Sequence, residues 1–110
     1  MKLAIIRCLQ TEDDCPGTTC FKVIYNKKLA FKDIEDDIEI VGVNTCGGCP
    51  GKKAVFRAKE MVRRGADTIA FASCITKGSP IGFPCPHANT IKERVESKVG
   101  KQIRIIDYTH

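Results

Sequence analysis

Apolar residues gather in four short runs along the chain, each bounded by charged residues or by glycine and proline. The runs cover residues 3–6, 38–43, 68–72 and 103–106. Short runs that are rich in isoleucine and valine are typical of strands buried on both faces of a parallel sheet. The pattern therefore predicts four buried β-strands.

Three segments between the runs show the 3.6-residue apolar spacing of amphipathic helices. Thr18 or Thr19 is expected to cap the first segment, and Gly65 and Gly100 are expected to end the other two. The inward stripes are Phe21, Ile24, Tyr25 and Phe31 in the first, Ala54, Val55, Ala58, Met61 and Val62 in the second, and Ile91, Val95 and Val99 in the third.

Strands and helices thus alternate along the chain, which predicts an α/β fold with a parallel sheet covered on both faces. We expect a small flavodoxin-like three-layer sandwich, with a mostly parallel four-stranded sheet in the order 2-1-3-4. A length of 110 residues suits a single domain over residues 1–110, and the 43% hydrophobic content is enough for a core without disulfides.

Charge and hydropathy exclude some classes of function. The net charge of +5 is a mild excess, and the basic residues are scattered without interleaved aromatic residues, so nucleic-acid binding is not expected. No apolar run is long enough to span a membrane, and the first one is too short for the core of a signal peptide. We therefore expect a cytoplasmic protein with no membrane association.

The seven cysteines change the picture most. Structural disulfides are rare in reducing compartments, and an odd number cannot pair completely within one chain. Metal binding or thiol redox chemistry is therefore the better explanation of this cysteine content.

Most thiols and imidazoles fall where a parallel sheet collects its ligands, beyond the carboxyl ends of the strands. If the cysteines were only small apolar core residues, several should fall within strands or on inward helix faces. Cys8 follows the first predicted strand, Cys46 and Cys49 the second, Cys74 the third and His110 the fourth, while Cys85 and His87 lie in the long loop that leaves the third.

Cys46 and Cys49 form a C-x-x-C pair between a strand and a helix. The two glycines between them let the chain turn and let backbone N–H groups point at sulfur, and the helix N-terminus favours thiolate over thiol. Such a pair either binds a metal or exchanges disulfides. Cys15 and Cys20, spaced C-x4-C around Pro16-Gly17, form a second site, assist the first, or have no role.

The same motifs support a family resemblance that covers nearly the whole chain. They are IIRC at residues 5–8, EDDCPGTTC at 12–20, CGGCPGKK at 46–53, GADTIAFASC at 65–74, CPH at 85–87, and Thr109-His110. The sequence resembles the CGGC domain family, a small group of prokaryotic proteins described as metal-binding, with zinc the usual suggestion. One departure is Tyr108, which stands where the family is expected to have a glycine before the threonine.

The resemblance implies a metal site but no particular reaction. Its family positions are Cys8, Cys15, Cys20, Cys46, Cys49, Cys74, Cys85, His87 and His110. We expect Cys8, Cys46, Cys49, Cys74 and Cys85 to bind zinc or, alternatively, an Fe–S cluster, with Cys15, Cys20, His87 and His110 as additional metal or redox residues.

Two alternatives remain open at this stage. One is a thiol-disulfide oxidoreductase that uses the Cys46/Cys49 dithiol. The other is a non-catalytic interaction module in which the metal only holds loops in place. No carboxylate stands beside a histidine in a recognisable catalytic spacing, so the sequence does not decide whether the protein is an enzyme.

Overall fold

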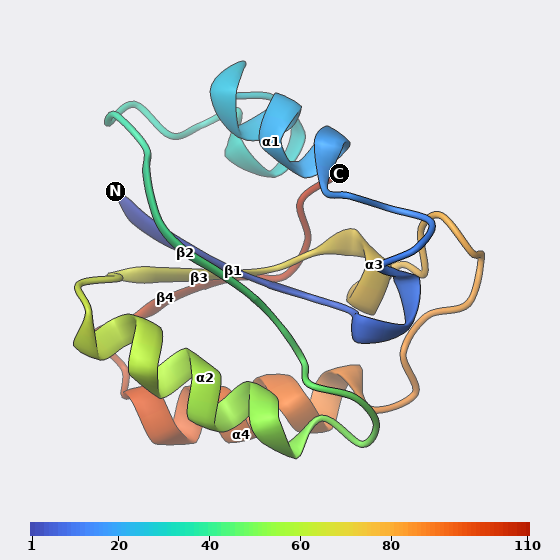
Figure 1. Ribbon diagram of the computed structural model, residues 1–110. Coiled ribbons are helices and arrows are strands. Elements are labelled where there is room, and N and C mark those ends of the chain that lie inside the picture. The colour runs from blue at the N-terminus through green and yellow to red at the C-terminus, as the bar shows by residue number, and fades with distance from the viewer.

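The computed structural model describes residues 1–110 as a sheet with helices on both faces (Figure 1). All four apolar runs form strands, and the predicted bounds agree with the observed ones to within two residues. The elements, with η for a short 3-10 helix, are β1 (Lys2–Arg7), η1 (Leu9–Thr11), α1 (Thr18–Tyr25), η2 (Leu29–Phe31), β2 (Glu39–Thr45), α2 (Lys52–Arg63), β3 (Thr68–Phe71), α3 (Ser73–Thr76), α4 (Ala88–Val99) and β4 (Arg104–Ile106).

The sheet has the predicted order, β2-β1-β3-β4, and every neighbouring pair of strands is parallel. Ile5 of β1 lies level with Val43 of β2 on one side and with Ala70 of β3 on the other. The first strand is therefore a central one, and all four strands end at the same edge of the sheet.

The helices make the two outer layers of the sandwich. In Figure 1, α1 and η2 lie on one face of the sheet, and α2 and α4 lie side by side on the other. The chain moves from β1 to β2 in one direction along the sheet and then crosses back to β3 and β4. Right-handed crossovers therefore place α1 on the face opposite to α2 and α4.

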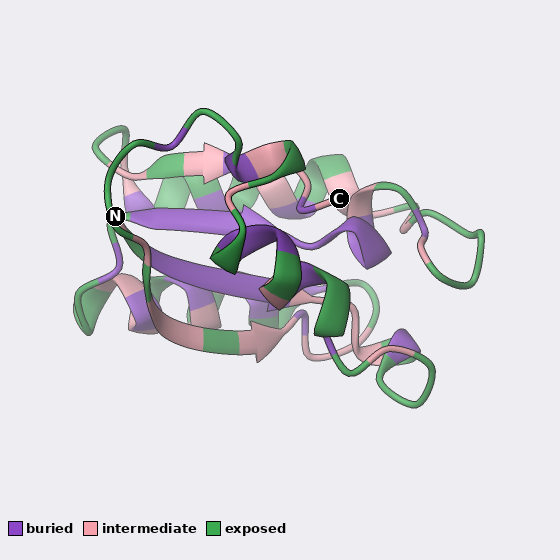
Figure 2. Ribbon diagram, turned by 90° about the horizontal axis from the view of Figure 1, so that it is seen from above, coloured by how far each residue is buried: buried purple, intermediate pink, exposed green.

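The core surrounds the two central strands, which are buried on both faces (Figure 2). Leu3, Ile5 and Ile6 of β1 and Ile69 of β3 are fully buried, whereas most residues of β2 are partly exposed. Each fully buried aliphatic side chain contributes about 1.5–3 kcal/mol of hydrophobic free energy. The centre of the sheet thus provides a rigid base for the loops at its carboxyl edge.

Two predictions about the first helix are wrong. Its N-cap is Gly17, with φ of 90° and no side-chain hydrogen bond, rather than Thr18 or Thr19. Its buried face consists of Cys20, Val23 and Ile24, while Tyr25 is 78% exposed. Because Cys20 is an inward apolar position of this helix, the stripe is rotated by one residue from the one predicted.

Two further features were not predicted. Phe31 is buried, but it belongs to the separate short helix η2 rather than to α1. The loop after β3 begins with the helix α3, which is only four residues long and so shows no helical periodicity in the sequence.

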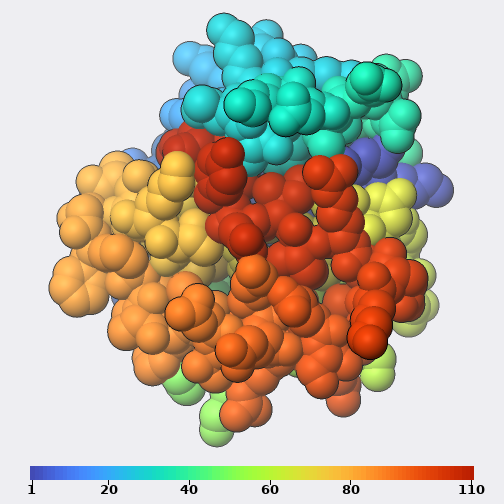
Figure 3. Space-filling model, turned by 180° about the vertical axis from the view of Figure 1, so that it is seen from behind, coloured from blue at the N-terminus to red at the C-terminus, as the bar shows by residue number.

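Viewed from behind, the C-terminal residues fill the space between the layer that contains α1 and the segment after α3 (Figure 3). None of the helices has the length and apolar character needed to cross a membrane.

Candidate metal centre at the carboxyl edge of the sheet

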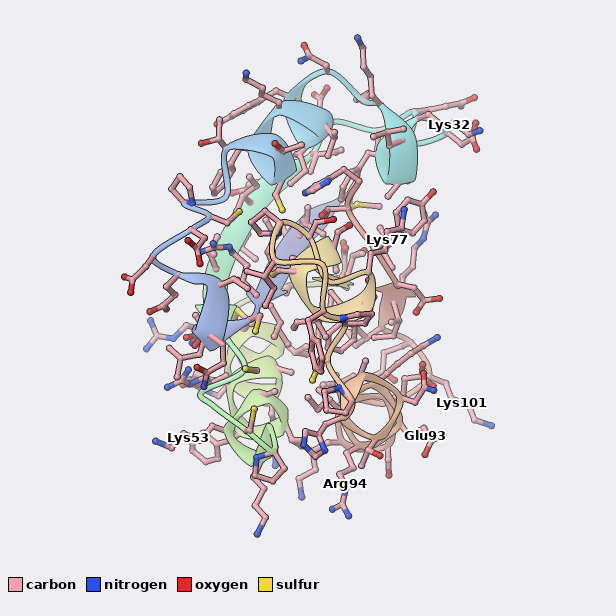
Figure 4. All side chains as sticks on the ribbon, turned by 90° about the vertical axis from the view of Figure 1, so that its right-hand side faces the viewer. Lys32, Lys53, Lys77, Glu93, Arg94 and Lys101 are labelled. Carbon is pink, nitrogen blue, oxygen red and sulfur yellow. The ribbon has the colours of Figure 1, made fainter.

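All seven cysteines lie at the carboxyl edge of the sheet, as the sequence predicted for the set. Figure 4 looks onto this edge and shows sulfur atoms gathered between the two helical layers. Cys8 follows β1, Cys46 follows β2, Cys74 lies in α3 directly after β3, Cys49 and Cys85 lie in the segments leading into α2 and α4, and Cys15 and Cys20 lie just before and within the first turn of α1.

Cys8, Cys46 and Cys74 meet around the end of β1 and are called the central thiols below. The Cys8 N–H donates a hydrogen bond to Cys74 Sγ at 3.2 Å, and the Leu9 N–H donates to Cys46 Sγ at 3.5 Å. At Cys46, the donor is the Leu9 N–H rather than the glycine N–H of the CGGC turn that the sequence predicted. The end of β1 therefore holds sulfur atoms from the loops after both neighbouring strands.

The pKa of the Cys8 thiol is raised, and the two other central thiols are among the causes. Burial raises this pKa most, and the neighbouring Cys46 and Cys74 raise it further by charge repulsion. Backbone hydrogen bonds from Gln10 and Thr11 act in the opposite direction. Three thiolates at this place would repel one another, so a bound cation would relieve the repulsion.

The CGGC turn separates an inner thiol from an outer one. Cys46 is 5% exposed, whereas Cys49 is exposed to solvent. Gly47 and Gly48 between them have φ of 79° and 105°, and a Cβ on Gly47 would lie 2.5 Å from Lys53 Cβ. Only glycine satisfies both the backbone angle and this close approach to α2.

Cys85 joins this group from the loop that leads to α4. Its N–H donates to the carbonyl of Ile75, and its sulfur accepts from the His87 N–H at 3.4 Å. Burial raises the pKa of Cys85 most, and charge repulsion from Cys49 and Cys46 raises it further. Cys85 therefore lies close to the CGGC pair. His87 is the N-cap of α4, and it lines a cavity of about 200 Å³ with Pro50 and Gly51.

The C-terminal segment is fastened to the start of α3. Ser73 Oγ accepts hydrogen bonds from the N–H groups of Thr109 at 3.2 Å and His110 at 2.9 Å, and the Ser73 N–H donates to Thr109 Oγ1 at 3.2 Å. Lys77 Nζ donates to the His110 carbonyl at 3.1 Å. The pKa of the His110 imidazole is lowered by burial first and by the charge of Lys77 second.

Cys15 and Cys20 form a second group of thiols, on the side of the edge nearest α1. Cys20 is 3% exposed, and its Sγ lies 3.2 Å from Thr109 Oγ1, with which it shares a hydrogen bond. Burial raises the pKa of Cys20 most, the hydrogen bond from Thr109 lowers it, and charge repulsion from Cys74 and Cys15 raises it again. The guanidinium of Arg7 lowers the same pKa and donates a hydrogen bond to the Cys15 carbonyl.

The sulfurs suit a metal by their chemistry but do not form a finished shell. Thiolate is the preferred ligand of zinc and of Fe–S clusters, and five thiols lie at this part of the edge. However, no group of three or more histidine, cysteine, aspartate or glutamate side chains is close enough as placed to hold a metal ion. The backbone brings the five cysteines to one part of the edge, and metal binding would require their side chains to turn toward one point.

Sequence reasoning missed three residues that shape this edge. Ser73 and Thr109 are both fully buried polar residues, and they anchor the C-terminus to the loop that carries Cys74. A serine directly after an apolar strand was the available signal for Ser73. Arg7 reads as the charged end of the first apolar run, and nothing in the sequence places its guanidinium beside Cys15.

Comparison with known proteins gives a consistent family assignment. A family model described as the CGGC domain matches residues 2–110. One uncharacterized protein of Methanocaldococcus jannaschii is 41% identical over 95 residues, which cover 81% of this chain and 70% of that protein. A second uncharacterized protein of that organism is 36% identical over 64 residues, which cover 57% of this chain and 91% of that protein. No solved structure matches the chain.

Proposed function

This chain belongs to the CGGC domain family, and on that premise we propose that the thiols at its carboxyl edge bind a metal. The observation that carries the proposal is the pair of N–H···S hydrogen bonds at the end of β1, to Cys74 and to Cys46. Backbone N–H groups directed at sulfur stabilise the thiolate, and the thiolate is the form that binds metal.

The central thiols Cys8, Cys46 and Cys74 are the proposed inner ligands, and Cys49 or Cys85 is the proposed fourth. Cys49 is exposed and Cys85 lies outside the helices and strands. Both can therefore turn toward the central thiols without disturbing the buried sheet. This movement would complete the shell that the side chains do not form as placed.

Zinc is the metal that we propose, because four thiolates around it form a tetrahedral site with bonds of about 2.3 Å. Four protein ligands would close the site and give it a structural role, as in an interaction module, whereas three would leave a position for Lewis-acid chemistry. An Fe–S cluster takes the same ligands and is the alternative occupant.

Elemental analysis of protein purified without oxygen, together with its visible spectrum, tests the proposal. A colourless protein with stoichiometric zinc is the expected result, and a brown protein with iron and sulfide would identify the alternative. Protein that contains neither metal, and takes up neither on reconstitution, would contradict the proposal.

Serine variants test which thiols are ligands. Cys46→Ser and Cys8→Ser should lose most of the metal, because each removes an inner ligand. Cys15→Ser is the matched control, since Cys15 lies in the second group of thiols, and it should keep the metal. Full metal content in Cys46→Ser would show that the central thiols are not the site.

One observation favours a second candidate, a thiol-disulfide oxidoreductase. The CGGC turn combines an exposed thiol with a buried one, and disulfide exchange needs such an attacking thiol and a resolving thiol beside it. In that case Cys49 would react promptly with an alkylating reagent in reduced, untreated protein, and the protein would reduce insulin disulfides. In the metal-bound protein, prompt alkylation should be weak and should increase after a chelator is added.

A further inference from the structure

The second group of thiols has a feature that the proposed metal centre does not use, the partly buried guanidinium of Arg7. Its Nε is buried without a hydrogen-bond partner. The structure has four ion pairs, and Arg7 takes part in none of them. A partly buried cation without a counter-charge is unfavourable, so this position favours an anion beside it.

The groups near Arg7 that can become anions are thiols. Its guanidinium donates a hydrogen bond to the carbonyl of Cys15 and is close enough to Cys20 to stabilise negative charge there. The guanidinium packs against the turn between the two cysteines, since a Cβ on Gly17 would lie 3.5 Å from Arg7 Nε, which is an ordinary contact distance. Glycine is needed at this position because its φ is 90°.

The two thiols differ in their access to solvent, which assigns their roles. Cys15 is partly exposed on the loop before α1. Cys20 is 3% exposed in the first turn of α1 and is held by Thr109. An exposed thiol can attack an external partner, and a buried thiol beside it can resolve the intermediate.

We propose that Cys15 and Cys20 are a redox dithiol that reacts with small external disulfides, with Arg7 as the residue that stabilises the Cys20 thiolate. This site uses none of the proposed metal ligands, although Cys20 lies near Cys74. The Cys15 thiolate attacks one sulfur of the external disulfide, which forms a mixed disulfide and releases one thiolate. The Cys20 thiolate then attacks the Cys15 sulfur, which forms the Cys15–Cys20 disulfide and releases the second thiolate.

The step balances without a further reactant. The external disulfide is reduced to two thiols, and the Cys15–Cys20 pair is oxidised to one disulfide. The two protons from Cys15 and Cys20 pass to the two released thiolates. Oxidised glutathione is therefore a sufficient probe of the reaction.

The experiment is peptide mapping after incubation of the reduced protein with oxidised glutathione. Free thiols are blocked by alkylation, and the chain is cut at the acidic residues between Cys8 and Cys15, so that these two cysteines fall in different peptides. The expected product is one peptide that contains both Cys15 and Cys20 and has lost two hydrogen atoms. Linkage of Cys20 to Cys74, linkage of Cys15 to Cys8 or to Cys46, or no linkage at Cys15 would overturn the proposal.

Variants test the assigned roles. Cys20→Ser should stop the reaction at a mixed disulfide between Cys15 and glutathione, and Cys15→Ser should abolish the reaction. Should Cys20→Ser fail to fold because Cys20 is buried, Cys15→Ser still decides the matter. Unchanged reaction at Cys20 in Cys15→Ser would overturn the order of attack.

Arg7→Gln should slow the conversion of the mixed disulfide into the Cys15–Cys20 disulfide about tenfold, because it removes the positive charge beside the Cys20 thiolate. Arg94→Gln, at an exposed arginine on α4, is the matched control and should react at the rate of the unaltered protein. An unchanged rate in Arg7→Gln would overturn the role of Arg7.

Metal content measured in the same samples separates this inference from the proposed metal centre. Cys15→Ser should retain the metal and lose the redox reaction, while Cys46→Ser should lose the metal and keep the reaction. If the unaltered protein bound no metal on reconstitution and still formed the Cys15–Cys20 disulfide, the proposed function would be disproved and this inference would stand.

Discussion

Two turns of this chain place a pair of cysteines at the start of a helix, and they use the same backbone device. Gly17 is the N-cap of α1 and Gly51 is the N-cap of α2, with φ of 90° and 91°. Neither helix has a side-chain hydrogen bond at its cap. The two turns differ in which cysteine of the pair is buried.

In the CGGC turn the buried cysteine is the first of the pair, and in the CPGTTC turn it is the last. Cys46 therefore faces the end of β1, where it accepts from the Leu9 N–H, whereas Cys20 faces the C-terminal segment and contacts Thr109. The position of the buried sulfur relative to the turn decides which neighbours it meets. The spacing of the cysteines in the sequence does not predict whether a buried thiol lies with the central thiols or near Arg7.

The largest expected difference between the turns concerns stability. Removal of metal by a chelator, or the substitution Cys46→Ser, should lower the free energy of unfolding by about 4 kcal/mol, since a metal that binds only the folded chain stabilises it by mass action. Cys15→Ser should change this free energy by less than about 1 kcal/mol. Chemical denaturation with and without chelator measures both values, and equal losses in the two variants would erase the distinction.

Cys20 in the second turn contacts Thr109, and Ser73 holds Thr109 in place. A substitution at Ser73 therefore tests this contact. Ser73→Ala removes the acceptor of the Thr109 and His110 N–H groups and should cost about 3 kcal/mol, because two donors lose their partner, one of them on a fully buried residue. Ser97→Ala on the exposed face of α4 is the control and should be close to neutral. Thermal denaturation measures the difference, and a neutral Ser73→Ala would show that the C-terminal segment is not held as described.

The turn backbones can be compared through their glycines. Gly47→Ala should cost about 2 kcal/mol, because its positive φ disfavours alanine and the new Cβ meets Lys53. Gly82→Ala has a φ of 73° with no atom within 4 Å of the new Cβ, so it should show the conformational cost alone, about 1 kcal/mol. A Gly47→Ala variant no less stable than Gly82→Ala would argue against close packing of the CGGC turn on α2.

The smallest effect concerns pH and the C-terminal segment next to the second turn. The pKa of His110 is lower in the folded chain than in the unfolded one, through burial and through Lys77. The unfolded chain therefore binds the proton more readily, so the contribution of His110 to stability is present above about pH 6.5 and is lost as the pH falls through the folded-state pKa. An NMR titration of metal-free protein should show a depressed His110 pKa that rises in Lys77→Gln, and an unshifted value would contradict this account.

Most of the fold follows from the sequence because its elements are long enough to show their period. The apolar runs that become β1 and β3, and the stripe of Ala54, Ala58 and Met61 in α2, specify burial by pattern alone. The helix α3 was missed because four residues cannot display a helical stripe. Tyr25 was misplaced because Cys20, rather than an aliphatic residue, begins the buried face of α1.

The sequence predicts which edge of the sheet carries the candidate site, but it does not predict which side chains meet there. Parallel strands bring every strand-end cysteine to one side, so the neighbourhood of Cys8, Cys46 and Cys74 follows from topology. The pairing of Arg7 with the Cys15 carbonyl depends instead on side-chain direction, which no pattern of apolar residues specifies. The ligand role of each thiol remains a prediction that the variants above test.

The central position of β1 also sets the order in which the molecule can assemble. This strand is made well before its partners: just after it, Leu9 contacts Cys46, which is 37 residues away, and Cys8 contacts Cys74, which is 66 residues away. Contacts between such distant residues form slowly, and the apolar strand stays exposed until they do. The proposed metal centre therefore cannot form until synthesis has passed β3, so the uptake of metal by a growing chain would report that β1, β2 and β3 have all been made.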